Sequence, residues 1–254
     1  MVEGPILRLV LVDSELEIVP GEYWSHPAVV QNARRRKKRP SRVLLDSSLH
    51  HSVFSDPEEK NRRGRPDIAH QFMLLCLDSI PNQEGRLSLH VHTRNDEVIY
   101  VDPRTRLPKN YNRFSGLMEE LFRTGAVPTE SSPLLRMKRN TGYSELVSEL
   151  SKRAKIAGRG FCSVALDISG RPGSMIDVLR EVLDTETNID VVVSVGGFSS
   201  GGYRSDVLGS ADITVSIYPE LLKVWTVVSE VLVSFHYVSS GSHGTGSAVI
   251  NGIP

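Results

Sequence analysis

A glycine-rich stretch at residues 195–203, Val-Gly-Gly-Phe-Ser-Ser-Gly-Gly-Tyr, is the first candidate for chemistry in this sequence. It directly follows an apolar run at 190–195 that indicates a buried strand, and glycine lets the backbone approach a flat or anionic ligand closely. Ligands of open α/β sheets bind beyond the carboxyl ends of strands. The stretch has no Gly-Lys-Ser/Thr triphosphate motif and no clean dinucleotide fingerprint. It therefore predicts a different nucleotide-like ligand or, equally well, a tight turn without one.

Basic residues form three clusters in the first half of the chain. These are the run Arg-Arg-Arg-Lys-Lys-Arg at 34–39, then Lys60, Arg62, Arg63 and Arg65, then Arg104, Arg106, Lys109 and Arg113. The last three, separated by three and four residues, can share one side of a turn-like path. Because the chain has no net charge, with 30 basic and 30 acidic residues, this uneven placement predicts a surface that binds a polyanion. Solvated loops, or a floppy arm at 34–39, are the alternative.

Arg65 and Asp67 are spaced so that they can pair. Arg65 stands directly before Pro66, which favours extended backbone and keeps the arginine side chain out of a helix. The Asp67 carboxylate can then hold the guanidinium through two hydrogen bonds and fix its plane for stacking or for phosphate contact. Alternatively, Asp67 caps the helix that begins there.

Four residues could bind a metal but lack the spacing for it. His90 and His92 alternate along one predicted strand and share a face, but no third ligand has suitable spacing, so we expect exposed strand histidines. Cys76 and Cys162 are the only cysteines and lie in apolar runs, which favours reduced, buried thiols. We predict no metal site.

Length and composition set the class of protein. A chain of 254 residues with 39 % hydrophobic content fits one large α/β domain or two small ones. No apolar run approaches the roughly 20 residues that cross a bilayer, and residues 6–12 indicate a first strand rather than a signal peptide. We expect a cytoplasmic protein without membrane contact, nucleolar if the source is a eukaryote.

Hydrophobic periodicity places these residues on elements. In the first half it predicts strands at 6–12 and 43–45, a helix beginning near 26, a loop at 50–66, an apolar helix from Asp67, a β-hairpin at 87–93 and 97–101, and an amphipathic helix at 114–122. In the second half it predicts strands at 161–168, 190–195 and 212–217, a turn at 170–173, and helices at 174–184 and 219–236. Such alternation indicates a parallel sheet with helices on both faces.

Six segments together resemble one family, the small-subunit rRNA pseudouridine N1-methyltransferases of ribosome biogenesis. They are Leu44-Leu-Asp-Ser-Ser-Leu-His-His, Gly64-Arg-Pro-Asp-Ile-Ala-His-Gln-Phe, His92-Thr-Arg-Asn-Asp-Glu-Val-Ile-Tyr, Arg106-Leu-Pro-Lys-Asn-Tyr-Asn-Arg-Phe-Ser-Gly-Leu-Met, Val195-Gly-Gly-Phe and Ser216-Ile-Tyr-Pro. They occur in the family's order over roughly residues 5 to 236. The resemblance implies a SPOUT-type α/β fold, a trefoil-knotted parallel sheet flanked by helices, with an inserted antiparallel β-hairpin. We therefore predict one domain at 1–238, its hairpin extension at about 86–112, and a disordered tail at 239–254.

The resemblance also implies the site. S-adenosylmethionine would bind at Ile168, Gly196, Gly201, Gly202, Tyr203, Val215, Ser216, Ile217, Tyr218, Pro219 and Glu220. The RNA-binding positions would be Arg65, Arg106, Lys109 and Arg113, with Arg65 and Asp67 as the catalytic residues. The side chains around Gly201 to Arg204 depart from the family pattern, and the tail has no counterpart in it.

The activity implied is methyl transfer from S-adenosylmethionine to N1 of a pseudouridine in small-subunit rRNA. The cofactor supplies the methyl group, so the protein has to position the base and remove its ring proton. No residue stands out as the general base. The expected partners are small-subunit rRNA, a second copy of the chain and ribosome assembly factors. A non-catalytic rRNA-binding assembly factor and a knotted tRNA methyltransferase are the alternative functions.

Overall fold

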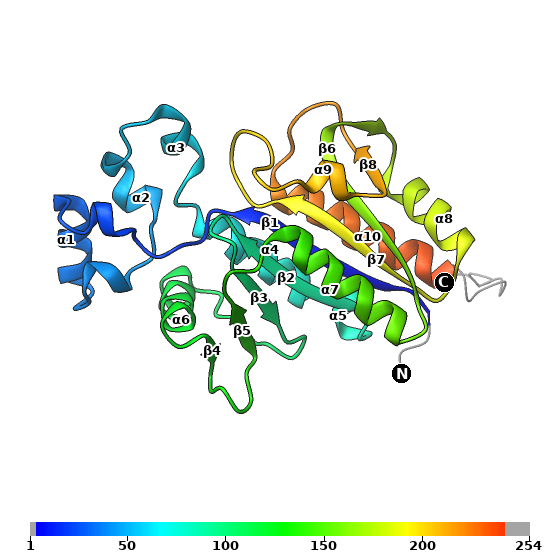
Figure 1. Cartoon of the computed structure of the whole chain (residues 1–254), viewed down its shortest axis with the longest axis horizontal. Coiled ribbons are helices and arrows are strands. Elements are labelled where there is room, and N and C mark those ends of the chain that lie inside the picture. Colours follow the sequence, from blue (N-terminus) through cyan, green and yellow to red (C-terminus); the bar gives the residue numbers. More distant parts are fainter. Residues whose placement is uncertain (1–3, 242–254) are drawn as a thin grey trace, which may run out of the picture.

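The structure is a computed structural model that describes residues 4–241. Its centre is one eight-stranded sheet in the order β4-β5-β3-β2-β1-β7-β6-β8 (Figure 1). The strands are β1 (Ile6–Ser14), β2 (Leu87–Thr93), β3 (Val98–Val101), β4 (Ala126–Val127), β5 (Leu135–Lys138), β6 (Gly160–Pro172), β7 (Ile189–Gly196) and β8 (Ile213–Ser216). The five strands from β2 to β8 are parallel, and β3, β5 and β4 continue the sheet as an antiparallel edge. The expected mixture of a parallel sheet and a hairpin is therefore present.

Apolar runs in β1 and β7 follow from their place in the sheet. β1 pairs with β2 on one side and β7 on the other, and Leu7, Leu9, Val191 and Val193 are all fully buried. A parallel strand covered on both faces has no side that water reaches, so its sequence is almost continuously apolar. The parallel pairing also brings the carboxyl ends of β1, β7, β6 and β8 to one edge of the sheet.

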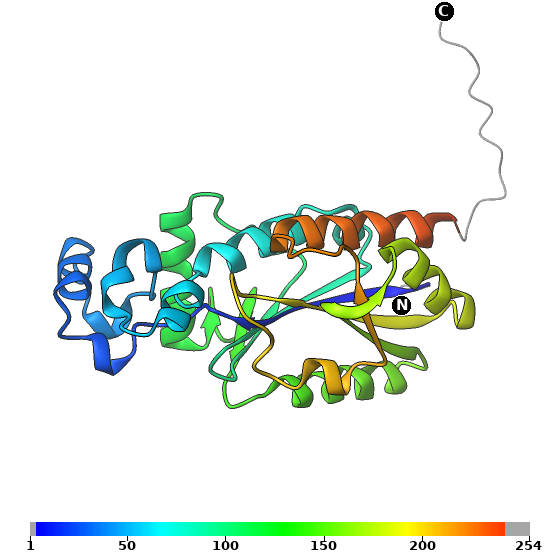
Figure 2. The same ribbon diagram turned by 90° about the horizontal axis from the view of Figure 1, so that it is seen from above.

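Helices cover both faces of the sheet (Figure 2). One face carries α4 (Pro66–Leu77), α5 (Ile80–Gln83), α6 (Tyr111–Thr124), α8 (Met175–Thr185) and α10 (Val224–Gly241); the other carries α7 (Tyr143–Ile156) and α9 (Val207–Ser210). The larger core lies under the first group and the smaller under α7. Within the described residues, no helix is both long and apolar enough to cross a membrane.

A small lobe extends from the end of the sheet (Figure 1). It contains α1 (Pro27–Arg35), α2 (Ser47–His50), α3 (Pro57–Arg62) and the short 3-10 helices Gly21–Tyr23, Pro40–Arg42 and His51–Val53. Its own core is built from Val19, Val29, Ala33, Val43, Leu45, Val53 and Phe54.

Two predictions fail in this lobe. The strand expected at 43–45 is absent: only Leu44 forms an isolated bridge, to Ile18, and the apolar side chains there fill the lobe's core. The loop expected at 50–66 contains α3, because Asp56 accepts a hydrogen bond from the Glu58 backbone N–H and Pro57 takes the first helical position. Asp-Pro at 56–57 is thus a helix start rather than a loop signal.

The second half also departs from prediction at two boundaries. The turn expected at 170–173 lies largely within β6, which runs to Pro172. The helix expected from 219 begins only at Val224, and it continues to Gly241, so residues 239–241 are helical rather than part of a disordered tail. The rest of the predicted tail, 242–254, lies outside the described residues. The helix α7 completes the second face and was not among the elements that hydrophobic periodicity predicts.

Candidate active site

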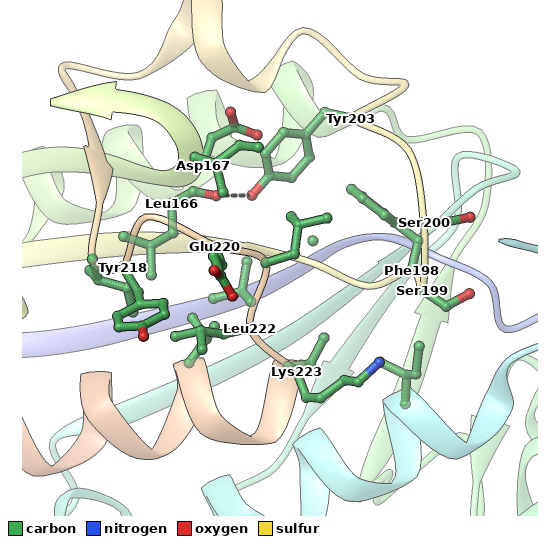
Figure 3. Close-up of a pocket in the computed structure, with 18 of the residues that line it drawn as sticks. Leu166, Asp167, Phe198, Ser199, Ser200, Tyr203, Tyr218, Glu220, Leu222 and Lys223 are labelled. Carbon is green, nitrogen blue, oxygen red and sulfur yellow. Dashed lines mark hydrogen bonds between the residues drawn. The ribbon is translucent and has the colours of Figure 1, made fainter. Parts of the chain in front are cut away.

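A cavity lies at the edge of the sheet where β6, β7 and β8 end (Figure 3). The loops after these strands line most of it, and Arg65 and Ile68 from the start of α4 join them. Nine of the eleven predicted cofactor residues belong to the lining: Ile168, Gly196, Gly201, Tyr203, Val215, Ser216, Ile217, Tyr218 and Glu220. Gly202 and Pro219 do not. The structure therefore brings together residues as distant in the sequence as Arg65 and Val227.

Two lining residues, Asp167 and Ile168, lie on an arc within β6 where this strand is not paired with β8. Leu166 and Arg171 both pair with Val215 of β8, so the residues between them leave the ladder. A Cβ atom on Gly170 would lie 2.6 Å from the Val215 backbone nitrogen, which explains why glycine stands at this close approach. Asp167, on this arc, belongs to the cavity lining and lies beside Tyr203, as Figure 3 shows.

The lining fits S-adenosylmethionine in its chemistry. Apolar side chains that suit a flat adenine ring are contributed by Leu166, Val195, Phe198, Val215, Ile217 and Leu222, and charged groups by Arg65, Asp167, Glu220 and Lys223. Carboxylates suit ribose hydroxyls and the cationic sulfonium and ammonium groups, and cations suit the carboxylate of the methionine part. A mostly apolar pocket with a few convergent polar groups is the usual form of a cofactor site.

Two aromatic side chains shape the cavity next to Gly196. A Cβ atom on Gly196 would lie 2.7 Å from the Phe198 ring, so a side chain there would displace a lining residue. The Tyr203 hydroxyl donates a hydrogen bond to the Leu166 carbonyl oxygen over 2.8 Å, the dashed line in Figure 3, and its ring meets Phe198 edge-on. Burial raises the pKa of Tyr203, which keeps the hydroxyl protonated as a donor.

Arg65 and Asp67 pair as predicted. Arg65 Nε and Nη2 donate to the two Asp67 oxygens over 2.8 and 2.7 Å, and this pairing raises the pKa of the guanidinium. Arg65 is the residue before the first turn of α4, and no side chain caps that helix, so Asp67 serves the ion pair rather than a cap. The Arg65 side chain therefore reaches the cavity in a fixed plane.

We name three residues the outer cations: Arg106 and Lys109 on the segment that leads into α6, and Arg113 in the first turn of that helix. All three are exposed, and no acidic partner of theirs occurs in the described part of the chain. The segment is held against α4 because the His70 ring lies 2.8 Å from the Pro108 carbonyl oxygen and stacks on Phe114. Free cations on a fixed backbone suit phosphate contacts.

Two arginines of the middle basic cluster, Arg62 and Arg63, differ from their predicted role, whereas Lys60 is exposed. Arg62 Nε donates to Glu15, Arg63 Nε donates to Glu17, and the Arg62 and Arg63 side chains are only 10 % and 13 % exposed. Arg94 joins them by donating to Glu15 and Glu59. We name these three residues the inner arginines: Arg62, Arg63 and Arg94. They are neutralised inside the protein and cannot form part of a polyanion-binding surface.

The 34–39 run is folded rather than a floppy arm. It spans the end of α1 and the turn after it, and both Arg36 and Lys38 pair with Glu119 of α6, whose side chain is 2 % exposed. Glu119 also accepts a hydrogen bond from the Leu44 backbone N–H. The run is thereby fixed beside α6, with Arg34, Lys37 and Arg39 exposed.

The strand histidines are buried, not exposed as predicted. His90 and His92 lie on β2 beneath α7, where their rings meet Tyr100 and Tyr143 edge-on. Burial lowers the pKa of His90 to about 3, so it is a neutral core residue. Among the described residues, no group of histidine, cysteine and acidic side chains is arranged to hold a metal ion.

Sequence reasoning missed several lining residues that lack a distinctive pattern. Leu221 to Trp225 line the cavity because the segment before α10 is irregular, whereas the apolar periodicity there indicates an uninterrupted helix. Asp167 belongs to no glycine-rich or basic pattern, and only the irregular pairing of β6 with β8 brings it to the cavity. Phe198 lies between recognisable glycines, and its position after a strand end was the available signal.

The chain is similar to proteins of known family. The family model "EMG1/NEP1 methyltransferase" matches residues 9–236. Two relatives are each named ribosomal RNA small subunit methyltransferase Nep1. The protein of Pyrococcus furiosus is 46 % identical over 231 residues, 91 % of this chain and 96 % of the relative, and that of Methanothrix thermoacetophila is 44 % identical over 230 residues, with 91 % and 95 % covered.

A crystal structure of Archaeoglobus fulgidus Nep1 bound to S-adenosylhomocysteine has the same fold. It superimposes with a TM-score of 0.75 at 33 % identity and covers 93 % of this chain and 99 % of its own. The likeness and the mixed sheet flanked by helices together confirm the SPOUT-type α/β fold. S-adenosylhomocysteine is the product that remains after S-adenosylmethionine has given up its methyl group.

Proposed function

Because the chain belongs to the EMG1/NEP1 methyltransferase family, we propose that it transfers the methyl group of S-adenosylmethionine to N1 of a pseudouridine in small-subunit rRNA. The observation that carries the proposal is the position of Arg65, which lies at the start of α4 and lines the same cavity as the loops after β6, β7 and β8. The methylation takes place during ribosome assembly, in the cytoplasm or, in a eukaryote, the nucleolus.

The residues of the chain divide the work. When bound, S-adenosylmethionine supplies an electrophilic methyl group. The cavity walls orient the cofactor, and Arg65, held in plane by Asp67, can stack on or donate to the acceptor base as it enters. In the transfer a bond forms from N1 to the methyl carbon, the sulfur–carbon bond breaks, and the N1 proton leaves. Asp67 is occupied by Arg65, so a water or a group on the cofactor side receives that proton.

The acceptor atom can be tested with two RNAs of the same loop sequence, one with pseudouridine and one with uridine at the target. Methyl incorporation is expected only into the first, because in uridine N1 carries the glycosidic bond. Mass analysis of nuclease fragments locates the methyl group. Equal incorporation into both RNAs would assign it to the ribose or to another ring atom.

The cofactor pocket can be tested at Gly196. A valine there would displace Phe198 and narrow the cavity, so Gly196→Val should abolish binding of S-adenosylmethionine in calorimetry. Gly116→Val is a matched control, since a Cβ on that glycine meets nothing within 4 Å. A folded Gly196→Val protein with unchanged affinity would remove this loop from the site.

The RNA is expected to cross the outer cations on its way to the cavity. These side chains are exposed and unpaired within residues 4–241, and their segment packs on the same helix that begins next to Arg65. Each protein contact to a phosphate of single-stranded RNA adds about 0.7 to the steepness of log affinity against log salt, so losing one contact lowers that steepness by the same amount. If variants of all three kept both affinity and slope, the RNA would dock elsewhere, with the exposed part of the 34–39 run as the next surface to test.

A second copy of the chain is the expected partner. Val233 and Tyr237 are 66 % and 60 % exposed on the same face of α10, and Leu221 before this helix is 73 % exposed. Neighbouring exposed apolar side chains favour a protein interface. Sedimentation analysis should give a dimer that Val233→Asp weakens, and a monomeric wild type at micromolar concentration would contradict it.

A further inference from the structure

We propose that Arg62, which does not line the cavity, is a positioning residue that holds residues 197–205, here named the cofactor loop, in the shape that binds S-adenosylmethionine. The inference rests on the proposed function of the cavity. It concerns a residue that the sequence places in a basic cluster and that the structure places behind the loop.

Arg62 contacts the cofactor loop at three points. Its Nη1 donates to the Gly202 carbonyl oxygen over 2.6 Å and to the Ser200 carbonyl oxygen over 3.3 Å. Its guanidinium carbon lies 4.0 Å from the centre of the Phe198 ring, which lines the cavity on its other side. One side chain therefore supports the loop's backbone and the back of an aromatic wall residue at once.

Glu15 fixes Arg62 in this position. The fully buried Glu15 carboxylate accepts from Arg62 Nε over 2.6 Å, and Arg94 donates to its other oxygen over 2.7 Å. Glu15 follows directly after β1, a strand at the centre of the sheet. The position of the guanidinium is thus set by the end of a central strand rather than by the loop itself.

The same segment holds both ends of the cofactor loop. The Gly197 backbone N–H donates to the Val12 carbonyl oxygen over 2.6 Å, where the loop begins. At the other end Asp13 accepts from the Ser205 hydroxyl over 2.6 Å and from the Ser205 backbone N–H over 3.1 Å. Between these anchors Arg62 holds two carbonyl oxygens of the loop, while the Ser199 and Tyr203 hydroxyls donate to the carbonyl oxygens of Asn61 and Leu166 over 2.6 and 2.8 Å.

Arg63 shows what a purely structural ion pair looks like at the neighbouring position. It is similarly buried, and its three nitrogens donate to Glu17 and Glu59, without contact to the cofactor loop. Arg62, by contrast, gives one nitrogen to Glu15 and one to the loop, and its Nη2 is buried with no partner among residues 4–241. The two arginines have the same charge and nearly the same exposure. Comparing a variant of each therefore distinguishes an effect on the position of the cofactor loop from an effect on the stability of the fold.

The experiment compares Arg62→Met, Arg62→Lys and the control Arg63→Met in the full-length protein. Affinity for S-adenosylmethionine is measured by calorimetry and stability by urea unfolding. If Arg62→Met leaves the loop in its binding shape about a tenth of the time, the dissociation constant rises about tenfold. Arg62→Lys should fall between this variant and wild type, since an ammonium reaches one partner. Arg63→Met should bind within about twofold of wild type although it unfolds more easily.

Hydrogen exchange of the cofactor-loop amides provides a second readout without cofactor. Faster exchange at 198–203 in both Arg62 variants, and not in Arg63→Met, would support the proposal even if Arg62→Met were too unstable for calorimetry. Wild-type affinity and exchange in a folded Arg62→Lys and Arg62→Met, or an equal loss in Arg63→Met, would overturn it. A wild type that fails to bind S-adenosylmethionine would instead refute the function of the cavity, while the exchange data would still test Arg62.

Discussion

The inner arginines lie against three glutamates inside the protein, whereas the outer cations face solvent without an acidic partner in the described residues. Both groups come from a stretch of about fifty residues with similar density of positive charge. What separates them is the position of their partners: Glu15 is 47 residues from Arg62 in sequence but beside it in the fold. A basic cluster predicts a polyanion-binding surface only where the fold supplies no counter-charge.

The strongest test of this comparison removes the counter-charge of the inner arginines. Glu15→Ala leaves two buried guanidinium groups without their shared carboxylate, which should lower the free energy of unfolding by about 3–5 kcal/mol. Urea unfolding measures it. Glu58→Ala, an exposed glutamate, is the control and should change stability by less than about 0.5 kcal/mol. An equally small effect of Glu15→Ala would mean that groups other than Glu15 neutralise the charges of Arg62 and Arg94.

Arg65 and Asp67 are less buried than the inner arginines and less exposed than the outer cations. Variants of these two residues should affect catalysis. Arg65→Ala should lower turnover about a hundredfold while changing the salt slope of RNA binding little, because a misplaced base reacts slowly. Asp67→Ala should lower turnover about tenfold, since the guanidinium remains but loses its fixed plane. Single-turnover kinetics beside binding measurements separates the two effects. Loss of affinity without loss of turnover would make Arg65 an ordinary phosphate contact.

The outer cations should show the reverse pattern to Glu15. Alanine at Arg106, Lys109 or Arg113 should change stability by less than about 0.5 kcal/mol and leave cofactor affinity unchanged. Each should weaken RNA binding and lower its salt slope by about 0.7. Binding titrations at several salt concentrations provide the slope. If alanine at one of these three positions destabilised the fold by several kcal/mol, the outer cations would contribute to stability as the inner arginines do, and the comparison would fail.

The smallest expected effect concerns acid. Burial raises the pKa of Glu59, but the hydrogen bond from Arg94 and the nearby arginine charges outweigh burial, so the net pKa is lower than usual. The ionised form therefore stabilises the folded state above the ordinary pKa of 4.5, and that contribution disappears as pH falls through the lowered value. Since solvent reaches this carboxylate, Glu59→Gln should flatten the acid loss of stability by less than about 1 kcal/mol. Unfolding curves at pH 5, 4 and 3 measure it, and a variant that still follows the wild-type curve would contradict it.

Local pattern predicted the elements whose packing is simple. The buried strands, the hairpin at 87–101 and the apolar face of α6 follow directly from hydrophobic periodicity. The pairing of Arg65 with Asp67 follows from their spacing around Pro66. The resemblance predicted most of the cavity lining, because short segments around Gly196 and Ser216 are distinctive.

Features that depend on distant partners could not be predicted. The burial of Arg62 requires knowing that Glu15 lies beside it, and the burial of His90 requires knowing that α7 covers β2. The arc in β6 depends on how Val215 pairs, which leaves no local trace beyond one glycine. Such contacts are set by topology, whereas sequence periodicity reports only which face of an element is apolar.

The order of strands in the sheet has a consequence for synthesis on the ribosome. β1 emerges first, but its neighbour β7 follows some 180 residues later, and β8 can add to the sheet only after β6 has formed. The nascent chain thus exposes one flank of its most apolar strand throughout most of translation, and contacts this distant in sequence form slowly. Ligand capture at the cavity is therefore a late event, which makes cofactor binding a natural reporter of completed folding.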